Sequence, residues 1–184
     1  LVAEGFDVIL LDGNLGVGES DKRIIKDNLS DCICVGISSM IGGGQLERGL
    51  EMSSYVKSLN REMPIVFGGP LGTVIPKILF SYPTIDYVVR GQGERPFLEL
   101  VNFFRSGQLV INIAGVVKRG DDKITKPAMY SKETLPPYPW YLLDVEKYVR
   151  QDRLLGERVI NFISSQGCPY ECGYCSEVSS YGRK

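Results

Sequence analysis

Along the first hundred residues, short apolar stretches rich in β-branched side chains alternate with stretches of helical period. The strands that this pattern predicts are residues 6–12, 32–38, 65–69 and 87–90. The helices that it predicts are residues 20–28, 45–61, 73–81 and 95–106. Strands that are apolar almost throughout are typical of a parallel sheet covered on both faces. The repeating order of strand and helix therefore predicts an α/β domain with a doubly wound parallel sheet.

Each predicted strand is followed by a loop of small residues and then by a helix. The four loops are residues 12–18, 38–44, 68–70 and 91–94. Glycine lets a backbone approach a ligand without a clash at Cβ, although tight-turn chemistry is the better explanation for any single loop. Loops at the carboxyl ends of parallel strands share one edge of the sheet. Four such loops at one edge favour a large planar or phosphate-bearing ligand.

The pattern changes after residue 107. Residues 113–118 and 123–126 are predicted to form a hairpin, and residues 135–140 a stiff, Pro-rich aromatic linker. A short helix is expected over 142–148 and a strand over 158–165. The predicted domains are 1–107 for the α/β domain, 108–157 for the hairpin and linker, and 158–184 for the start of a second domain. We expect a chain cut inside a domain at each end.

The strongest candidates for metal ligands are three thiols spaced C-x3-C-x2-C, namely Cys168, Cys172 and Cys175. Three soft ligands on one short loop can hold three irons of a cubic iron–sulfur cluster and leave the fourth iron open. A zinc site needs a fourth ligand, and the chain has no His. A redox pair of Cys172 and Cys175 leaves Cys168 unexplained. Cys32 and Cys34 fall in a predicted strand, where a small apolar role is expected.

Composition narrows the class of protein. The net charge is −1, and Lys and Arg form no basic block, so no nucleic-acid partner is expected. No apolar run approaches the ~18 residues that span a bilayer, and we expect neither a membrane span nor a signal peptide. An odd number of cysteines, five, with three at ligand spacing argues against a disulfide framework. A reducing cytoplasm is the expected location, because oxidation destroys a thiolate-held cluster.

The cysteine run resembles the signature of the radical S-adenosylmethionine (SAM) superfamily. Gly167-Cys168-Pro169 and the later Gly182-Arg183-Lys184 also match forms of that signature. The resemblance implies a truncated (β/α) barrel in which the three Cys bind a [4Fe–4S] cluster. It also implies that the amino and carboxylate groups of SAM take the fourth iron. Tyr174, before the last Cys, is implied to lie near the adenine of SAM.

The upstream part is similar to the cobalamin-binding domain that precedes the barrel in the B12-dependent branch of that superfamily. The matching stretches are residues 35–38, 67–70, 89–94 and the linker 135–148. The resemblance implies a flavodoxin-like or Rossmann-like sheet with cobalamin at its loops. The cobalamin contacts that it implies are Asp12, Asn14, Ser38, Ser39, Met40, Gly68, Gly69, Pro70, Gly91, Gln92, Gly93 and Glu94. For Glu94, the preferred role is to cap the amino end of the following helix.

One position departs from the common pattern of these domains. Many of them use Asp-x-His-x-x-Gly to place a His beneath the cobalt, whereas Asp12-Gly13-Asn14 has Asn at that place. The chain contains no His, so it cannot supply an imidazole ligand. The hypothesis is that cobalamin binds without His, with its tail in the crevice between Ser38 and Gly68.

The implied activity is that of a B12-dependent radical SAM enzyme. It would cleave SAM reductively and transfer a methyl group to an unactivated carbon or phosphorus centre, with flavodoxin or ferredoxin as electron donor. One alternative is a radical SAM enzyme, such as a cyclase, that uses B12 without methyl transfer. A second alternative is a non-catalytic B12-binding sensor module. As cut, the chain itself is expected to be inactive.

Overall fold

The computed structural model describes most of the chain. The described residues are 1–15, 18–40, 43–107, 112–129, 135–152, 154–161, 167–170 and 172–177. Its main sheet has four strands in the order β1 (Val35–Ser38), β2 (Ile65–Gly68), β3 (Tyr87–Val89) and β4 (Val116–Lys118). β1, β2 and β3 are parallel, and β4 is antiparallel to β3. The predicted parallel sheet is confirmed, with one antiparallel edge strand added.

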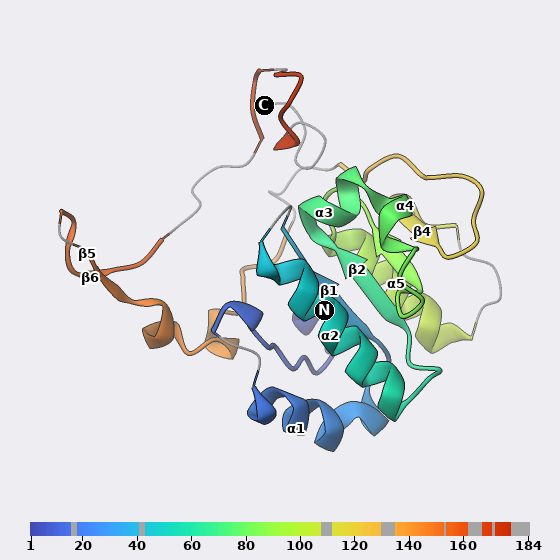
Figure 1. The fold of residues 1–184 in the computed structure, drawn as a ribbon, viewed down its shortest axis with the longest axis horizontal. Coiled ribbons are helices and arrows are strands. Elements are labelled where there is room, and N and C mark those ends of the chain that lie inside the picture. Colours follow the sequence, from blue (N-terminus) through green and yellow to red (C-terminus); the bar gives the residue numbers. More distant parts are fainter. Residues whose placement is uncertain are drawn as a thin grey trace.

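In the part of the chain that the structure describes, five α-helices and several short 3-10 helices connect and cover these strands. The α-helices are α1 (Glu19–Asn28), α2 (Gly44–Leu59), α3 (Gly69–Val74), α4 (Pro76–Leu79) and α5 (Glu94–Ser106). The 3-10 helices are η1 (Val2–Glu4), η2 (Gly13–Leu15), η3 (Leu29–Asp31), η5 (Trp140–Leu142) and η6 (Val145–Tyr148). A separate hairpin pairs β5 (Arg150–Asp152) with β6 (Gly156–Val159). In Figure 1 this hairpin lies well to one side of the layered α/β part.

The core lies on both faces of the main sheet. On one face, Ile65 and Phe67 are fully buried against α1 and α2 side chains such as Val56. On the other, Val66 and Val89 pack against Leu100 of α5. Figure 1 shows α2 in front of the strands and α5 behind them. Because neighbouring residues of a strand point to opposite faces, a fully apolar β2 requires cover on both sides. This is the predicted doubly wound arrangement.

The predicted strand over residues 6–12 is wrong. That segment has no strand assignment and pairs with none of the described strands. Ile9 and Leu10 are half exposed as a result. A strand forms only where a neighbour supplies its ladder of backbone hydrogen bonds, and β1 is the outermost described strand on that side of the sheet. Apolar pattern alone therefore gave the wrong secondary structure here.

Four further predictions need correction. β4 pairs with β3, and residues 123–126 form no strand, so the expected hairpin within 113–126 does not exist. The predicted helix over 73–81 breaks at Ile75, because a residue before proline avoids helical backbone angles. Residues 142–148 give parts of two 3-10 helices instead of one helix. In place of the strand predicted over 158–165, the structure has β6, which begins at Gly156 and ends at Val159. Residues 162–166 lie outside the described residues.

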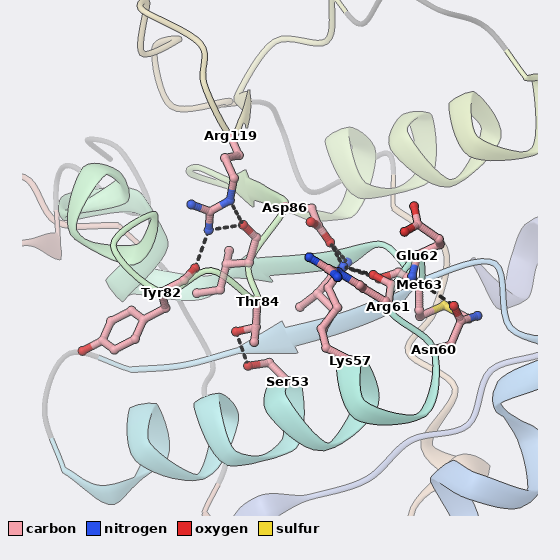
Figure 2. A network of polar contacts seen from close by, with 12 residues as sticks. Ser53, Lys57, Asn60, Arg61, Glu62, Met63, Tyr82, Thr84, Asp86 and Arg119 are labelled. Atoms are coloured by element: carbon pink, nitrogen blue, oxygen red, sulfur yellow. Dashed lines mark hydrogen bonds and ion pairs between the residues drawn. The ribbon is translucent and has the colours of Figure 1, made fainter.

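A polar network fastens the amino ends of β2 and β3 (Figure 2). The Lys57 ammonium donates to an Asp86 carboxylate oxygen at 2.8 Å and to the carbonyls of Arg61 and Met63. The same Asp86 oxygen accepts the backbone N–H of Ile65 at 2.8 Å. Lys57 is therefore a structural cation, and the network holds the edge of the sheet opposite to the predicted ligand loops.

Arg119, just after β4, completes this edge. Its guanidinium donates to the carbonyls of Phe80, Tyr82 and Ile85. The guanidinium carbon also lies 5.5 Å from the centre of the Phe80 ring, in a cation–π contact. Five guanidinium donors in one plane can serve several carbonyls of one turn at once. The turn between α4 and β3 is thereby tied to β4, and the carboxyl edge is left to the glycine loops.

Candidate functional site

The loops after β1 and β2 meet at the carboxyl edge of the sheet. Ser38 stands opposite Gly68 in the parallel register. The Ser39 N–H donates to the Gly68 carbonyl at 3.3 Å, and the Ser39 carbonyl accepts from Leu71 N–H at 3.3 Å. Ser39 is buried, and its hydroxyl donates to the Met40 carbonyl. The structure thus brings together the predicted residues of these two loops.

Gly69 shows why this contact needs glycine. Its φ is 81°, a left-handed conformation that side chains disfavour. A Cβ there would lie 2.7 Å from the Ser39 carbonyl oxygen and 2.8 Å from Ser38 Oγ. The residue also begins α3, with Pro70 in its first turn, where the missing N–H of proline costs nothing. The sequence Gly68-Gly69-Pro70 is therefore the local cause of a close approach between the two loops.

Thr73 links this pair of loops to the third. Its hydroxyl donates to the Gly69 carbonyl at 3.0 Å and accepts the Gly91 N–H at 2.8 Å. Arg90 donates to the Thr73 carbonyl from Nε and Nη2 and to the Thr125 carbonyl from Nη1. Burial lowers the pKa of Arg90 from its ordinary value. One continuous hydrogen-bonded edge therefore runs from β1 to the loop after β3.

The third loop is fixed by Ala128. Gly91 has φ 79°, and a Cβ there would lie 2.7 Å from the Ala128 nitrogen. The Gln92 N–H donates to the Ala128 carbonyl at 2.9 Å, and the Ala128 N–H donates to the Arg90 carbonyl at 3.0 Å. Gln92 is buried, Gly93 is the N-cap of α5, and Glu94 is its first residue. An acidic side chain is favourable there, as expected for Glu94.

Met40 lies beside this edge with half of its side chain exposed. Its N–H donates to Gln45 Oε1 at 2.9 Å, which ties the loop after β1 to the start of α2. Residues 41–42 of the same loop lie outside the described residues. A soft, flexible thioether at an exposed edge can adapt to an apolar ligand surface.

Asp12 and Asn14 belong to the segment that precedes α1. Asp12 accepts a hydrogen bond from the Tyr148 hydroxyl at 2.7 Å. Partial removal from water and the Asp12 carboxylate raise the pKa of Tyr148 to about 12. Arg48 of α2 donates to the Gly13 carbonyl at 2.6 Å, which holds this segment against α2. Asn14 lies in η2, and its side chain lies outside what the structure describes.

The three cysteines of the predicted cluster lie on one short segment. Cys172 and Cys175 are exposed, Cys168 is half-buried, and the Cys175 N–H donates to the Cys172 carbonyl at 3.0 Å. Within the described ranges, no three Cys, Asp or Glu side chains gather closely enough to hold a metal ion. The donor chemistry fits an iron–sulfur cluster, and such ligands are drawn together by the metal itself. Tyr174 is 93% exposed beside them. The cluster and SAM contacts stay predictions.

Cys32 and Cys34 differ from these three. Both are half-buried next to β1, and burial raises the pKa of Cys34 to about 12 and also raises that of Cys32. A thiol with a raised pKa is a poor metal ligand, because the thiolate is the ligating form. The structure thus supports the apolar role expected for them.

Sequence reasoning missed the residues that join the loops. Thr73, Ala128 and Tyr148 were not expected at the edge, because their partners are 18 to 136 positions away. No local pattern marks such partners. A polar residue in an otherwise apolar helix, as with the buried Thr73, was the one available signal.

With this geometry established, comparison with known proteins decides the family. The profile of the B12 binding domain matches residues 1–101, more than half of the chain. The chain belongs to the B12-binding domain family. The matched range ends within α5, so it contains β1, β2, β3 and all three joined loops.

Curated relatives match over the whole chain. An uncharacterized methyltransferase of Pyrococcus horikoshii is 28% identical over 100% of the chain, which covers 40% of that relative. The anaerobic magnesium-protoporphyrin IX monomethyl ester cyclase of Synechocystis is 27% identical over 100% of the chain and 37% of its own length. The chain therefore spans about two fifths of the length of these relatives.

A solved structure shares the fold. The radical S-adenosylmethionine methyltransferase TsrM from Kitasatospora setae, with cobalamin and a [4Fe–4S] cluster bound, matches with a TM-score of 0.67 at 20% identity. The match covers 99% of this chain and 38% of that one. The resemblance to cobalamin-dependent radical SAM proteins and the α/β fold are confirmed. Among the described residues, none of the helices has the length and apolar character that crossing a membrane requires.

Proposed function

We propose that the chain binds cobalamin at the carboxyl edge of β1, β2 and β3. The match of residues 1–101 to the B12-binding family carries this proposal. The joined loops support it, because the bonds of Ser39 and the close approaches at Gly69 and Gly91 hold the three loops together at this edge. Ser38, Met40 and Gly68 would line the same crevice. No His is present to ligate the cobalt, so cobalamin would bind without an imidazole from this chain.

Cobalamin binding can be tested with a matched pair of substitutions. Ser38 is exposed at the crevice, whereas Ser58 is exposed near the far end of α2. Ser38→Leu should weaken binding of hydroxocobalamin by about tenfold or more, because the branched side chain occupies the ligand's place. Ser58→Leu should leave binding unchanged. Equal affinity of both variants and the unsubstituted chain would contradict the location, and no binding by any of them would contradict the function.

The absence of His gives a second readout. Bound cob(II)alamin should show an electron paramagnetic resonance spectrum without the nitrogen splitting of an axial imidazole from the protein. The lack of His excludes an imidazole of the chain but no other nitrogen donor. A splitting from any nitrogen of the protein would therefore refute binding without a protein ligand.

We further propose that Cys168, Cys172 and Cys175 hold a [4Fe–4S] cluster that belongs to a radical SAM enzyme. When bound, the cluster supplies an electron for cleavage of SAM, and cobalamin supplies a transferable methyl group. The residues of this chain would anchor the cluster and, through Tyr174, contact SAM. A reduced flavodoxin or ferredoxin would be the electron donor in the cytoplasm. The relative named a methyltransferase and the relative named a cyclase are similar in identity, 28% and 27%. We propose methyl transfer to carbon or phosphorus as the reaction, with a cyclase that uses B12 without methyl transfer as the alternative.

Anaerobic reconstitution with iron and sulfide tests the cluster. The chain should take up about four irons, and Cys175→Ala should abolish most of that uptake together with the visible charge-transfer band. Cys32→Ala is the matched control, because that thiol is half-buried beside β1. Iron uptake that survives Cys175→Ala, or that is lost equally in Cys32→Ala, would overturn the cluster assignment.

A further inference from the structure

The structure contains a cavity between the linker and the β5–β6 hairpin. Its volume is about 300 Å³, and it is formed by η5, η6, β5 and the residues after β6. Its walls are Trp140, Leu143, Val145 and Ile160. This volume is at the lower end of the range for small-molecule sites, which suits a ligand of about two rings.

The walls of this cavity are apolar side chains that the protein leaves partly uncovered. Trp140 is 55% exposed and Ile160 is 50% exposed. The Tyr138 ring lies 5.7 Å from that of Trp140 and supports the indole from outside. Large apolar side chains that converge on one concavity indicate a ligand more strongly than the same residues scattered over a surface.

Among the described residues that line the cavity, one carries a charge, and that charge is positive. It belongs to Arg150, whose Nη2 donates to Asn161 Oδ1 at 3.0 Å across the hairpin. No carboxylate belongs to this described lining. Asp152 on the same strand uses one oxygen to accept the N–H groups of Leu154 and Leu155. A guanidinium beside an apolar wall matches an anionic group on an apolar body.

The neighbouring elements brace the cavity from two sides. Tyr148, in its lining, is held by Asp12 through the bond of 2.7 Å. On the outer side, Arg158 Nη2 contacts both carboxylate oxygens of Glu146 at 2.8 Å. Glu146 is thus paired with Arg158, whereas Asp12 and Asp152 accept hydrogen bonds from neutral donors and keep their negative charge. An anionic ligand would therefore have to contact the Arg150 guanidinium directly.

We propose that this cavity binds a small apolar carboxylate, with the rings against Trp140 and Ile160 and the anionic group on Arg150. The site goes beyond cobalamin and cluster binding and does not rest on either. It lies where the linker meets the hairpin. Of the cobalamin contacts predicted above, none whose side chain the structure describes lines it, although Asp12 bonds the lining residue Tyr148.

The test uses the one tryptophan of the chain as its reporter. 2-Naphthoate titrated into the ¹⁵N-labelled chain should shift the single indole N–H resonance in a saturable way. 2-Naphthamide, which has the same rings without the charge, should bind about tenfold more weakly or worse. This comparison needs no substitution, so a folding defect cannot obscure it. The absence of saturation up to millimolar naphthoate would overturn the proposal, and so would equal affinity for the two compounds.

A matched pair of variants assigns the charge. Arg150→Met should remove the preference for naphthoate over naphthamide while the apolar contacts remain. Arg23→Met removes the same charge from an exposed position on α1, outside the cavity lining, and it should keep the preference. Equal loss in both variants would mean that general surface charge attracts the probe, which would overturn the assignment to Arg150.

Discussion

Replacing Gly91 by alanine tests whether the loop after β3 is held as the structure shows. Gly91 has φ 79°, so alanine there incurs the left-handed strain of about 1–2 kcal/mol. Its Cβ would also press against the backbone of Ala128, within 2.7 Å of the nitrogen. That contact displaces two hydrogen bonds, from Gln92 N–H and from Ala128 N–H. At about 1 kcal/mol each, they bring the expected loss to roughly 3–4 kcal/mol.

Gly120 supplies the matched control. Its φ is 88°, but no atom lies within 4 Å of a Cβ placed there. Gly120→Ala should therefore cost only the backbone strain, about 1–2 kcal/mol. The difference between the two variants isolates the contact with Ala128.

Urea unfolding followed by circular dichroism measures both variants. With a slope of roughly 2 kcal/mol per M, Gly91→Ala should lower the midpoint about 1 M further than Gly120→Ala does. Equal midpoints would refute the reasoning, because they would mean that the loop is not closed against Ala128. Arg90 and Thr73 would then have no fixed loop to support.

Three other predictions concern single side chains. Lys57→Met should destabilise the chain by about 2 kcal/mol in urea unfolding, since it leaves Asp86 and two carbonyls without the Lys57 donor. Arg23→Met removes an exposed ion pair at 3.6 Å and should change stability by less than about 0.5 kcal/mol. Equal effects of the two substitutions would contradict the network. The folded-state pKa of Tyr148, about 12, lies above its ordinary value of 10.0, so its stabilisation is present below pH 10 and lost as the pH rises toward 12. The gap in thermal midpoint between the chain and Tyr148→Phe should close over that window, and a gap independent of pH would argue against the bond to Asp12. In metal-free protein at pH 8, iodoacetamide should alkylate Cys34 at least tenfold more slowly than exposed Cys172, because burial raises the pKa of Cys34 to about 12. Peptide mass spectrometry measures both rates, and equal rates would contradict the burial of Cys34.

The sequence by itself determined the layered α/β architecture. Apolar β-branched runs such as Ile65-Val66-Phe67 can be satisfied only by cover on two faces, so the parallel sheet followed from local pattern. The small-residue loops followed as well, because Gly69 and Gly91 mark backbone angles that other residues avoid. The thiol spacing at Cys168, Cys172 and Cys175 is likewise a local property of the chain.

Tertiary structure decided the features that depend on a distant partner. Residues 6–12 have the composition of a strand, yet no described strand offers them a ladder. β4 pairs with β3, on the far side of α5 in the sequence, instead of with residues 123–126. Thr73, Ala128 and Tyr148 gain their roles from contacts across the fold. Hydrogen bonds between remote segments form only when packing brings those segments together, and the local sequence of one segment does not specify which other segment will lie beside it.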